Sequence, residues 1–361
     1  MKRVVAAIDS FKGCLRSAEA NAAAAAGVRE VWPDAQVREV TVSDGGEGFM
    51  EAFFAATGGE IQSVQVHDPL MREVSAKYLL NGQRAVIEVA EACGLWRLTK
   101  EELNPLIATS YGVGELILDA VEKGAKEIIV GLGGSGTSDA GKGMLEVIKT
   151  AATTLKEQRP VKDPEGRGDA AERVKYIIAT DVNNPLCGEN GAAAVFGPQK
   201  GATPEMVKEL DARARLFAEE SAQRMGHDRS NEPGAGAAGG LGYAFMQYLD
   251  AERRSGIELL LETIDFDRMT QAADLVITGE GAADRQTLMG KLPTGILRHA
   301  GKTPVCLIAG KISDGEALVQ AGFAEAVCIN PPHLALEEAM RPEVAQRNIR
   351  ETVARIISKR G

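Results

Sequence analysis

Short runs of apolar, mostly β-branched residues alternate with longer segments of helical character along most of the chain. The first run, residues 4–8, ends at Asp9 and is followed by the alanine-rich residues 17–31. A run of this length followed by a long alanine-rich segment predicts a strand, a loop and a helix. The same order recurs, with strands expected at 37–42, 127–130, 176–179, 275–278, 305–309 and 326–329 and helices at 46–57 and 137–148.

Fully apolar strands that alternate with helices predict a parallel sheet covered on both faces, and therefore an α/β fold. Apolar and polar residues alternate instead in two stretches, 74–80 and 85–89, which are joined by a turn at Asn81-Gly82. We therefore expect further strands there, at the passage into a second domain. Residues 158–173 are charged, contain two prolines and lack apolar periodicity. An exposed loop is expected for them.

Length and charge narrow the class of protein. A chain of 361 residues exceeds the usual size of one hydrophobic core, so two domains are expected. The formal net charge of −10 argues against a nucleic-acid partner, since binding a phosphate backbone needs clustered Lys and Arg. The five cysteines form no CxxC pair, and no apolar run is long enough for a leader or a membrane span. We therefore expect reduced thiols, no membrane partner and a cytoplasmic location.

Glycines interleaved with acidic and hydroxyl residues follow several of the expected strands. The longest cluster covers residues 131–143, and related clusters lie at 9–13, 44–48, 181–201, 233–242 and 278–281. Glycine lets backbone amides approach an anion closely, while nearby hydroxyls and carboxylates can hold a metal ion. Ligands of open parallel sheets bind at the carboxyl ends of the strands, where these clusters fall. The sequence therefore predicts an enzyme that handles phosphate.

The cluster at 131–143 also contains GxGxxG at Gly131, Gly133 and Gly136. A dinucleotide site would need an acidic residue at the end of a second strand about 20 positions on, and no strand is expected there. Ser135, Thr137 and Asp139 instead offer oxygens beside a helix N-terminus, where phosphate binds well. Simple capping of that helix by Thr137 or Ser138 stays an alternative. No Walker A motif is present.

Three other polar residues follow expected strands. Lys12 can neutralise a carboxylate or phosphate, or it is a solvated surface lysine. Asp44, in Asp44-Gly-Gly-Glu-Gly48, orients a hydroxyl or holds Mg²⁺, or it merely forms a turn. Asp181 is a candidate base or metal ligand, with helix or turn capping as its alternative. The four histidines lack metal-ligand spacing, and Cys187 is interpreted as structural.

These clusters together resemble the bacterial glycerate kinase family, the type that phosphorylates the 2-hydroxyl of glycerate. The resemblance is carried by AIDSFKG, SDGGEG, NPLIATSYGVGELI, GLGGSGTSDAGKGM, ATDVNNPLCGENGAAAVFGPQKGAT, PGAGAAGGLGYAF, SGIELLLE and DLVITGEGAADRQTLMGK. It implies two α/β domains, a Rossmann-like one with a mostly parallel sheet from residues 1–80 and 270–361 and an inserted one from 81–269. Ala282 stands where the family usually has arginine, and Ser138 where asparagine is typical.

The resemblance further implies ATP-dependent phosphorylation of D-glycerate to 2-phosphoglycerate, with Mg²⁺ as cofactor. Phosphoryl transfer needs positioning and charge neutralisation above all. Asp181 is the preferred acceptor of the hydroxyl proton, Asp44 is the runner-up, and Lys12 balances charge. The residues expected to bind ATP are Gly133, Gly134, Ser135, Thr137, Gly279, Glu280 and Gly281. Those expected to bind glycerate are Ser10, Lys12, Asp44, Asn184 and Lys200, with Lys291 as a further cation. Those expected to hold Mg²⁺ are Asp139, Asp181 and Glu280.

Other functions stay open at this point. A kinase of another small hydroxy acid, or one that forms 3-phosphoglycerate, would use the same chemistry. A non-catalytic sugar-acid-binding protein is an alternative because of Ala282. An NAD-dependent dehydrogenase is disfavoured by the missing ribose-binding acid.

Overall fold

The chain folds into two compact units in a computed structural model that describes residues 1–43, 45–158 and 174–360. The first unit is built from the start of the chain up to Ser43, from residues 51–57 and from Gly256 onward, and the second from Gly45–Met50 and Gly58–Ser255. The second unit is thus inserted into the first. Each unit has its own sheet and its own core.

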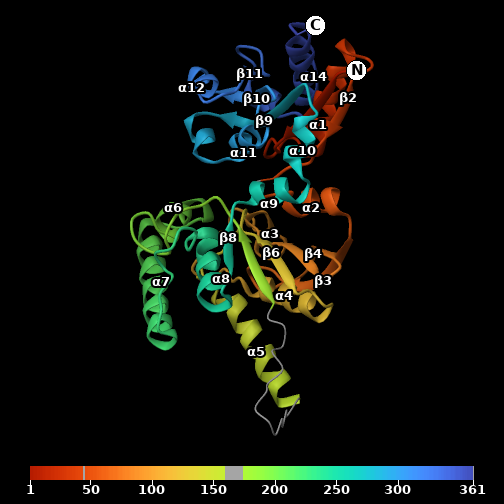
Figure 1. Ribbon diagram of the computed structural model, residues 1–361. Helices are drawn as coiled ribbons and strands as arrows, with labels where there is room; N and C mark the ends of the chain where they lie inside the picture. Colours follow the sequence, from red (N-terminus) through yellow and green to blue (C-terminus); the bar gives the residue numbers. More distant parts are fainter. Residues whose placement is uncertain (44, 159–173, 361) are drawn as a thin grey trace. The chain divides into compact units, whose positions relative to one another are not determined.

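The first unit contains a five-stranded, fully parallel sheet in the order β11-β10-β9-β1-β2. Its strands are β1 (Arg3–Ile8), β2 (Gln36–Glu39), β9 (Leu275–Ala283), β10 (Val305–Ile312) and β11 (Glu325–Cys328). Segments from the two ends of the chain lie side by side, since β1 pairs with β9, drawn in red and cyan-blue in Figure 1. All-parallel sheets are buried on both faces, which explains the uninterrupted apolar runs of β1 and β10.

Two long helices pack together against one face of this sheet. They are α1 (Ser17–Val31) and α14 (Pro342–Ser358). Gly27 of α1 lies so close to the Arg350 carbonyl of α14 that a Cβ atom would not fit between them. The remaining helical segments of this unit are α2 (Phe49–Thr57), whose first two residues count with the second unit, α9 (Gly256–Thr263), α10 (Phe266–Gln271), η4 (Arg285–Met289), α11 (Leu292–His299), α12 (Gly315–Gln320) and α13 (Leu336–Ala339).

The second unit has a six-stranded mixed sheet in the order β3-β4-β5-β6-β7-β8. Its strands are β3 (Glu60–His67), β4 (Glu73–Asn81), β5 (Arg84–Glu88), β6 (Glu127–Gly131), β7 (Lys175–Ala179) and β8 (Glu252–Arg254). The first three are antiparallel, and β5 to β8 are parallel. The parallel part carries the glycine cluster at the end of β6.

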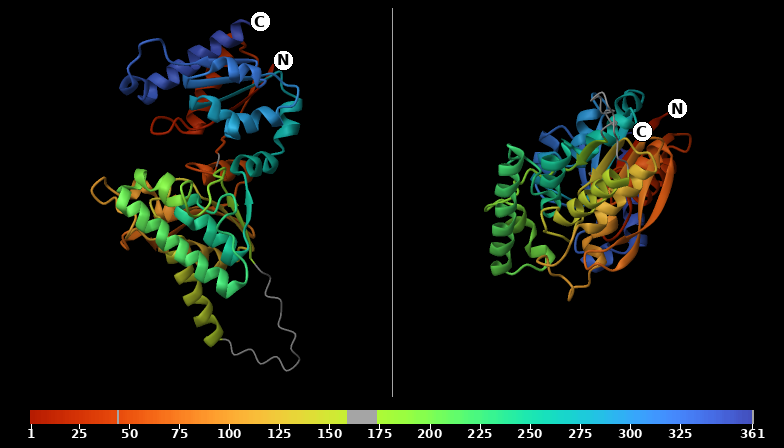
Figure 2. Two further views of the ribbon diagram at one scale, coloured as in Figure 1. Left: turned by 90° about the vertical axis from the view of Figure 1, so that its left-hand side faces the viewer. Right: turned by 90° about the horizontal axis from the view of Figure 1, so that it is seen from below.

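Helices surround this second sheet. They are α3 (Val89–Cys93), η1 (Leu95–Arg97), α4 (Tyr111–Glu122), α5 (Lys142–Gln158), α6 (Ala192–Phe196), η2 (Pro198–Lys200), α7 (Pro204–Met225), η3 (Ala237–Gly240) and α8 (Leu241–Leu249). The long green helix α7 lies on the outside of the unit in Figures 1 and 2, and it buries only Leu210, Ala218 and Ser221. Within the described part of the chain, no helix is both long and apolar enough to span a membrane.

The predicted α/β fold with a mostly parallel sheet from both chain ends is confirmed. The chain passes from one unit to the other near residues 58 and 256, however, rather than at the expected 80 and 270. The physical reason is strand pairing, because β3 and β4 form a hairpin that continues onto β5. Likewise, α9 and most of α10 precede residue 270 but pack with α11 in the first unit. The loop expected at 158–173 lies, apart from Gln158, outside the described residues.

Candidate functional site

A pocket of about 440 Å³ lies at the carboxyl ends of β1, β9 and β10 in the first unit. Ligands of open parallel sheets bind at this edge. Three lysines and two acidic residues line it, together with apolar side chains from α13 and its neighbourhood. The polar lining residues are Asp9, Ser10, Lys12, Glu280, Lys291, Lys311 and Asn330. Of the residues predicted for ATP, glycerate and metal, the pocket brings together Ser10, Lys12, Glu280, Gly281 and Lys291.

Glu280 is one of the two acidic residues that line this pocket. Its side chain is 11% exposed, and Oε1 accepts a hydrogen bond of 2.6 Å from Thr287 Oγ1. The other oxygen, Oε2, lies 3.8 Å from Nζ of Lys291, the residue that precedes α11. Thr287 is itself fully buried in η4. The carboxylate is therefore fixed in position while its second oxygen stays beside a cation.

The turn after β1 presents Lys12 to the same pocket. The Asp9 amide donates to the Gly279 carbonyl, so β1 and β9 stay paired up to their ends. Phe11 and Leu15 then form a short antiparallel bridge, with Gly13 at a φ of 72° in the left-handed region that glycine tolerates. Lys12 lies at the tip of this turn and is exposed. Its ammonium group is available to an anion from solvent.

Two glycines at the end of β9 have different roles in the structure. Gly279 is buried opposite Ile308 of β10, and an added Cβ would collide with the Ile308 carbonyl oxygen. Gly281 lines the pocket, and the nearest heavy atom to a Cβ there would be Phe11 Cα at 3.9 Å. Of the two, only Gly281 is placed to approach a ligand. Gly279 instead allows close packing of the strands.

The glycine cluster after β6 in the second unit is also shaped by close packing. An added Cβ at Gly133 would collide with Gly46, and one at Gly143 with Thr109 Oγ1. Gly134 and Gly141 have φ values of 74° and 73°, and Ala140 a φ of 55°. These left-handed residues explain why α5 begins at Lys142 rather than near the expected Thr137. Ser138 and Asp139 line a small cavity of about 100 Å³ together with Lys142 and Arg213.

Lys200 is a buried cation attached to this cluster. Its side chain is almost fully buried, and Nζ donates to Ser135 Oγ at 3.1 Å and to the Thr137 carbonyl at 2.6 Å. Burial lowers the pKa of Lys200 to about 8, although Cys93 and Asp139 oppose that shift. The structure thus brings together three predicted residues, Ser135, Thr137 and Lys200. Positive charge is held directly beneath the glycine cluster.

Asp139 is occupied by hydrogen bonds from its surroundings. Oδ2 accepts from the amide and hydroxyl of Ser110 at 2.9 and 2.8 Å and from the Gly143 amide at 3.1 Å. Oδ1 accepts from the Gly141 amide at 3.0 Å. These four donors tie the start of α5 to that of α4. A carboxylate that already accepts four hydrogen bonds is better explained by a structural role than by metal binding. The assignment of Asp139 as a metal ligand stays a prediction.

The loop after β7 holds two further predicted residues, Asp181 and Asn184. Asp181 is partly buried at the carboxyl end of β7. Asn184 Nδ2 donates to the Asn190 carbonyl at 2.8 Å, which closes its own loop. Asp44, predicted beside Lys12, lies outside the described residues.

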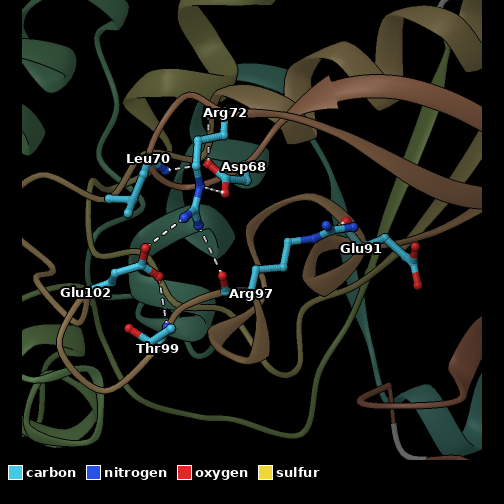
Figure 3. A network of polar contacts seen from close by, with 7 residues as sticks. All are labelled: Asp68, Leu70, Arg72, Glu91, Arg97, Thr99 and Glu102. Carbon is cyan, nitrogen blue, oxygen red and sulfur yellow. Dashed lines mark hydrogen bonds and ion pairs between the residues drawn. The ribbon is translucent and has the colours of Figure 1, made fainter.

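A network of charged side chains supports the glycine cluster from the side of η1. Arg72 donates to Asp68 Oδ2 at 2.6 Å, to Glu102 Oε1 at 2.7 Å and to the Arg97 carbonyl at 3.2 Å (Figure 3). The segment so anchored contains Leu95, whose amide donates to the Gly134 carbonyl at 2.8 Å. Burial of Asp68 raises its pKa, but hydrogen bonds from Arg72 and Leu70 outweigh burial and hold that pKa below its usual range.

Two further observations concern the groups that sequence analysis set aside or missed. Burial and the charge of Asp211 raise the pKa of the Cys187 thiol to about 11, which agrees with a structural role. Asn330 was not predicted, although it follows β11 and its position after a strand could have indicated it. Its Nδ2 donates to the Gly310 carbonyl at 2.8 Å. Among the described residues, no group of three or more His, Cys, Asp or Glu side chains is placed to hold a metal.

Comparison with known proteins places this architecture in one family. The model of the "Glycerate kinase family" matches residues 4–360. The chain is 40% identical to the glycerate kinase of Halalkalibacterium halodurans over 97% of each protein. It is 39% identical to the glycerate 2-kinase of Escherichia coli K12 over 98% of each. The crystal structure of a candidate glycerate kinase 2 from Salmonella typhimurium LT2 superposes with a TM-score of 0.80 and 37% identity, covering 99% of this chain and 98% of that one.

Matches of this length and identity span both units, including the strand ends and glycine clusters described above. The chain belongs to the glycerate kinase family.

Proposed function

We propose that this protein transfers the γ-phosphoryl group of ATP to D-glycerate and forms 2-phosphoglycerate. The main support is the charged pocket at the carboxyl ends of β1, β9 and β10. It gathers Lys12, Lys291 and Lys311 in a chain whose net charge is −10. Phosphoryl transfer requires the protein to position its reactants and to neutralise charge, and a cluster of lysines beside fixed carboxylates provides both.

Lys311 supplies the charge that the missing arginine would carry. Ala282 stands where the family usually has arginine, and in the parallel register of β9 and β10 it lies opposite Lys311. Registered neighbours on parallel strands point to the same face of the sheet. Both residues line the pocket. A lysine on the neighbouring strand thus restores a cation next to the altered position, and Lys311→Met should weaken activity as the loss of a phosphate-binding residue would.

The donor set of the pocket fits Mg²⁺. Magnesium is usually bound through one or two carboxylates together with substrate phosphates and water, so a cluster of three acidic residues is not required. Glu280 has one oxygen fixed by Thr287 and lies in the same pocket as Asp9. We assign Glu280 as the carboxylate that holds the ion. When bound, the ion would neutralise charge that develops on the transferred phosphate.

Residues of the second unit have proposed roles that rest on their own surroundings. Lys200 holds the glycine cluster through Ser135 and the Thr137 carbonyl and keeps positive charge beneath it. Gly133, Gly134, Ser135 and Thr137 remain the proposed nucleotide-binding residues. Asp181 is the proposed acceptor of the hydroxyl proton, because it is a partly buried carboxylate at a strand end. Asp139 is better explained as a brace.

The test combines activity and regiochemistry. The purified protein is incubated with ATP, Mg²⁺ and D-glycerate, ADP is measured by a coupled assay, and the product is identified by phosphorus NMR. The proposal expects the signal of 2-phosphoglycerate. A signal of 3-phosphoglycerate would correct the position of transfer, and ADP release only with a different hydroxy acid would correct the substrate. Absence of ADP with every hydroxy acid would overturn the proposed activity.

A further inference from the structure

A second cavity of the first unit lies at the opposite end of β1 from the candidate site. Its volume is about 700 Å³, and it is lined by Arg3, Val4 and Val5, by residues of β2 and its approach, and by α10 with its flanking residues. Asp9 and Ser10 line the other pocket. From Val5, which lines this cavity, to Asp9, which lines the other pocket, the strand extends by about 13 Å. Figure 1 shows the cyan helix α10 next to the red strands that form the floor.

The alternation of β1 and β2 places arginines on one face of the sheet. Val4, Ala6 and Ile8 belong to the core beneath α1 and α14. Arg3 and Val5 therefore point to the other face, and their registered neighbours on β2 are Gln36 and Arg38. Two arginines thus project from adjacent strands toward the cavity. Arg268 of α10 is the third arginine that lines the cavity. Arg29 lines it as well, but it belongs to α1 on the opposite face of the sheet and lies beside Glu39.

Most of this positive charge is not neutralised. Arg29 lies 3.4 Å from Glu39, but the side chains of Arg3, Arg38 and Arg268 form no ion pair with any residue in the described ranges. Asp265 is the single acidic residue among those that line the cavity. Guanidinium groups gathered without carboxylate partners repel one another. A concentration of this kind in a chain of net charge −10 favours an anionic ligand.

The lining also selects the kind of anion. A phosphate monoester carries close to two negative charges and three acceptor oxygens on one centre, so several guanidinium groups can share it. Ile264, Met269 and Ala272 add an apolar wall. The volume is in the range of cavities that hold small organic ligands. A phosphate with an organic part uses both features.

We propose that this cavity, formed by β1, β2 and α10, is a second binding site that takes a small organic phosphate. The ligand places its phosphate among Arg3, Arg38 and Arg268 and its organic part against α10. The site is independent of the proposed kinase activity, because none of its residues lines the pocket at the other end of β1.

The test measures binding of three phosphate monoesters by isothermal titration calorimetry: AMP, glucose 6-phosphate and glycerol 3-phosphate. The wild-type protein is compared with Arg38→Ala/Arg268→Ala and with a matched control, Arg347→Ala/Lys302→Ala, which removes the same charge from exposed positions elsewhere. Lys12→Met serves as the variant of the candidate site. Circular dichroism verifies that each variant is folded.

At least one monoester should bind wild type at millimolar concentration or better. Its affinity should fall about tenfold or more in the arginine variant, because charge-assisted hydrogen bonds are lost, and should be unchanged in the control and in Lys12→Met. ADP release by the arginine variant should equal that of wild type. Failure of all three monoesters to bind, or equal binding by wild type and the arginine variant, overturns the proposal.

Discussion

At the end of β9, neighbouring glycines have different roles, one in packing and the other in lining the pocket. Gly279 and Gly281 are two positions apart in β9, yet the first is closed in by the Ile308 carbonyl and the second faces the pocket. The sequence motif Thr278-Gly-Glu-Gly281 does not distinguish the two glycines. Only the register of β9 and β10 does, since it determines which backbone atoms lie opposite each residue.

A pair of alanine substitutions tests this difference. Gly279→Ala should lower the free energy of unfolding by about 1–3 kcal/mol, because a methyl group has to displace backbone in the centre of the sheet. Gly281→Ala should change that free energy by less than about 0.5 kcal/mol, as expected of a site with open space. It should instead raise the KM for ATP. Thermal unfolding and steady-state kinetics measure both effects, and equal loss of stability in the two variants would contradict the assignment.

Lys200 should make the stability of the protein depend on pH. Burial lowers its pKa to about 8, whereas an unfolded lysine titrates near 10.4. Between these values the unfolded chain binds more protons than the folded one, so the contribution of Lys200 to stability should rise with pH from about 8 to about 10 and stay constant below that window. The difference in denaturant unfolding between wild type and Lys200→Met isolates this contribution. A difference that does not vary with pH would disprove the lowered pKa.

Asp181→Asn tests the proposed proton acceptor. The amide has nearly the same shape as the carboxylate, so the fold should persist while the variant loses its base. Turnover should then fall by about 10²–10⁴-fold, the usual contribution of general-base catalysis. The measurement is kcat with saturating ATP and glycerate, with circular dichroism as the control for folding. A near-normal kcat would remove Asp181 from the mechanism.

At the scale of elements, the apolar runs located most strands, and long-range pairing determined the rest. The expected strands at 4–8 and 305–309 lie inside β1 and β10, because fully buried strands leave a continuous apolar signal. The start of α5 was expected five residues too early, since Ala140 and Gly141 adopt left-handed φ values that composition does not reveal. The Arg72 network was missed because its members come together only after folding.

This network should contribute measurably to stability. Arg72→Ala removes its bonds to Asp68, Glu102 and the Arg97 carbonyl, and should lower the free energy of unfolding, although only modestly because the Arg72 side chain is 46% exposed. The control is Arg350→Ala, whose partner Glu30 is 3.1 Å away on the surface, and which should change stability by less than about 0.5 kcal/mol. Urea unfolding compares the two.

The same network should make the protein less stable in acid. The pKa of Asp68 is lowered in the folded state, so its stabilisation is present above the unfolded value near 3.9 and is lost as pH falls through the folded pKa. The two variants should therefore differ at neutral pH and converge in acid. A difference that persists unchanged below that range would contradict the role of Asp68.

For the whole molecule, family and fold followed from the sequence, but the surroundings of each residue did not. The order of glycine clusters indicated the glycerate kinase family, and the family match over residues 4–360 confirms it. Of the predicted residues, one pocket contains Ser10, Lys12, Glu280, Gly281 and Lys291. Three others, Ser135, Thr137 and Lys200, are joined by hydrogen bonds. The hydrogen bonds of Asp139 depend on contacts between segments that are distant in the sequence. The same holds for the cavity formed by β1, β2 and α10, and local sequence patterns do not specify such contacts.

The central claim is that the pocket at the carboxyl ends of β1, β9 and β10 supports phosphoryl transfer. The most direct measurement compares kcat/KM for ADP release of Lys12→Met with that of Lys302→Met, which removes an exposed lysine outside the pocket. With ATP, Mg²⁺ and D-glycerate, Lys12→Met should lose about 10²-fold or more, because one preorganised charge is removed from the transition state, while Lys302→Met should match wild type. Equal activity of the two variants would contradict the account.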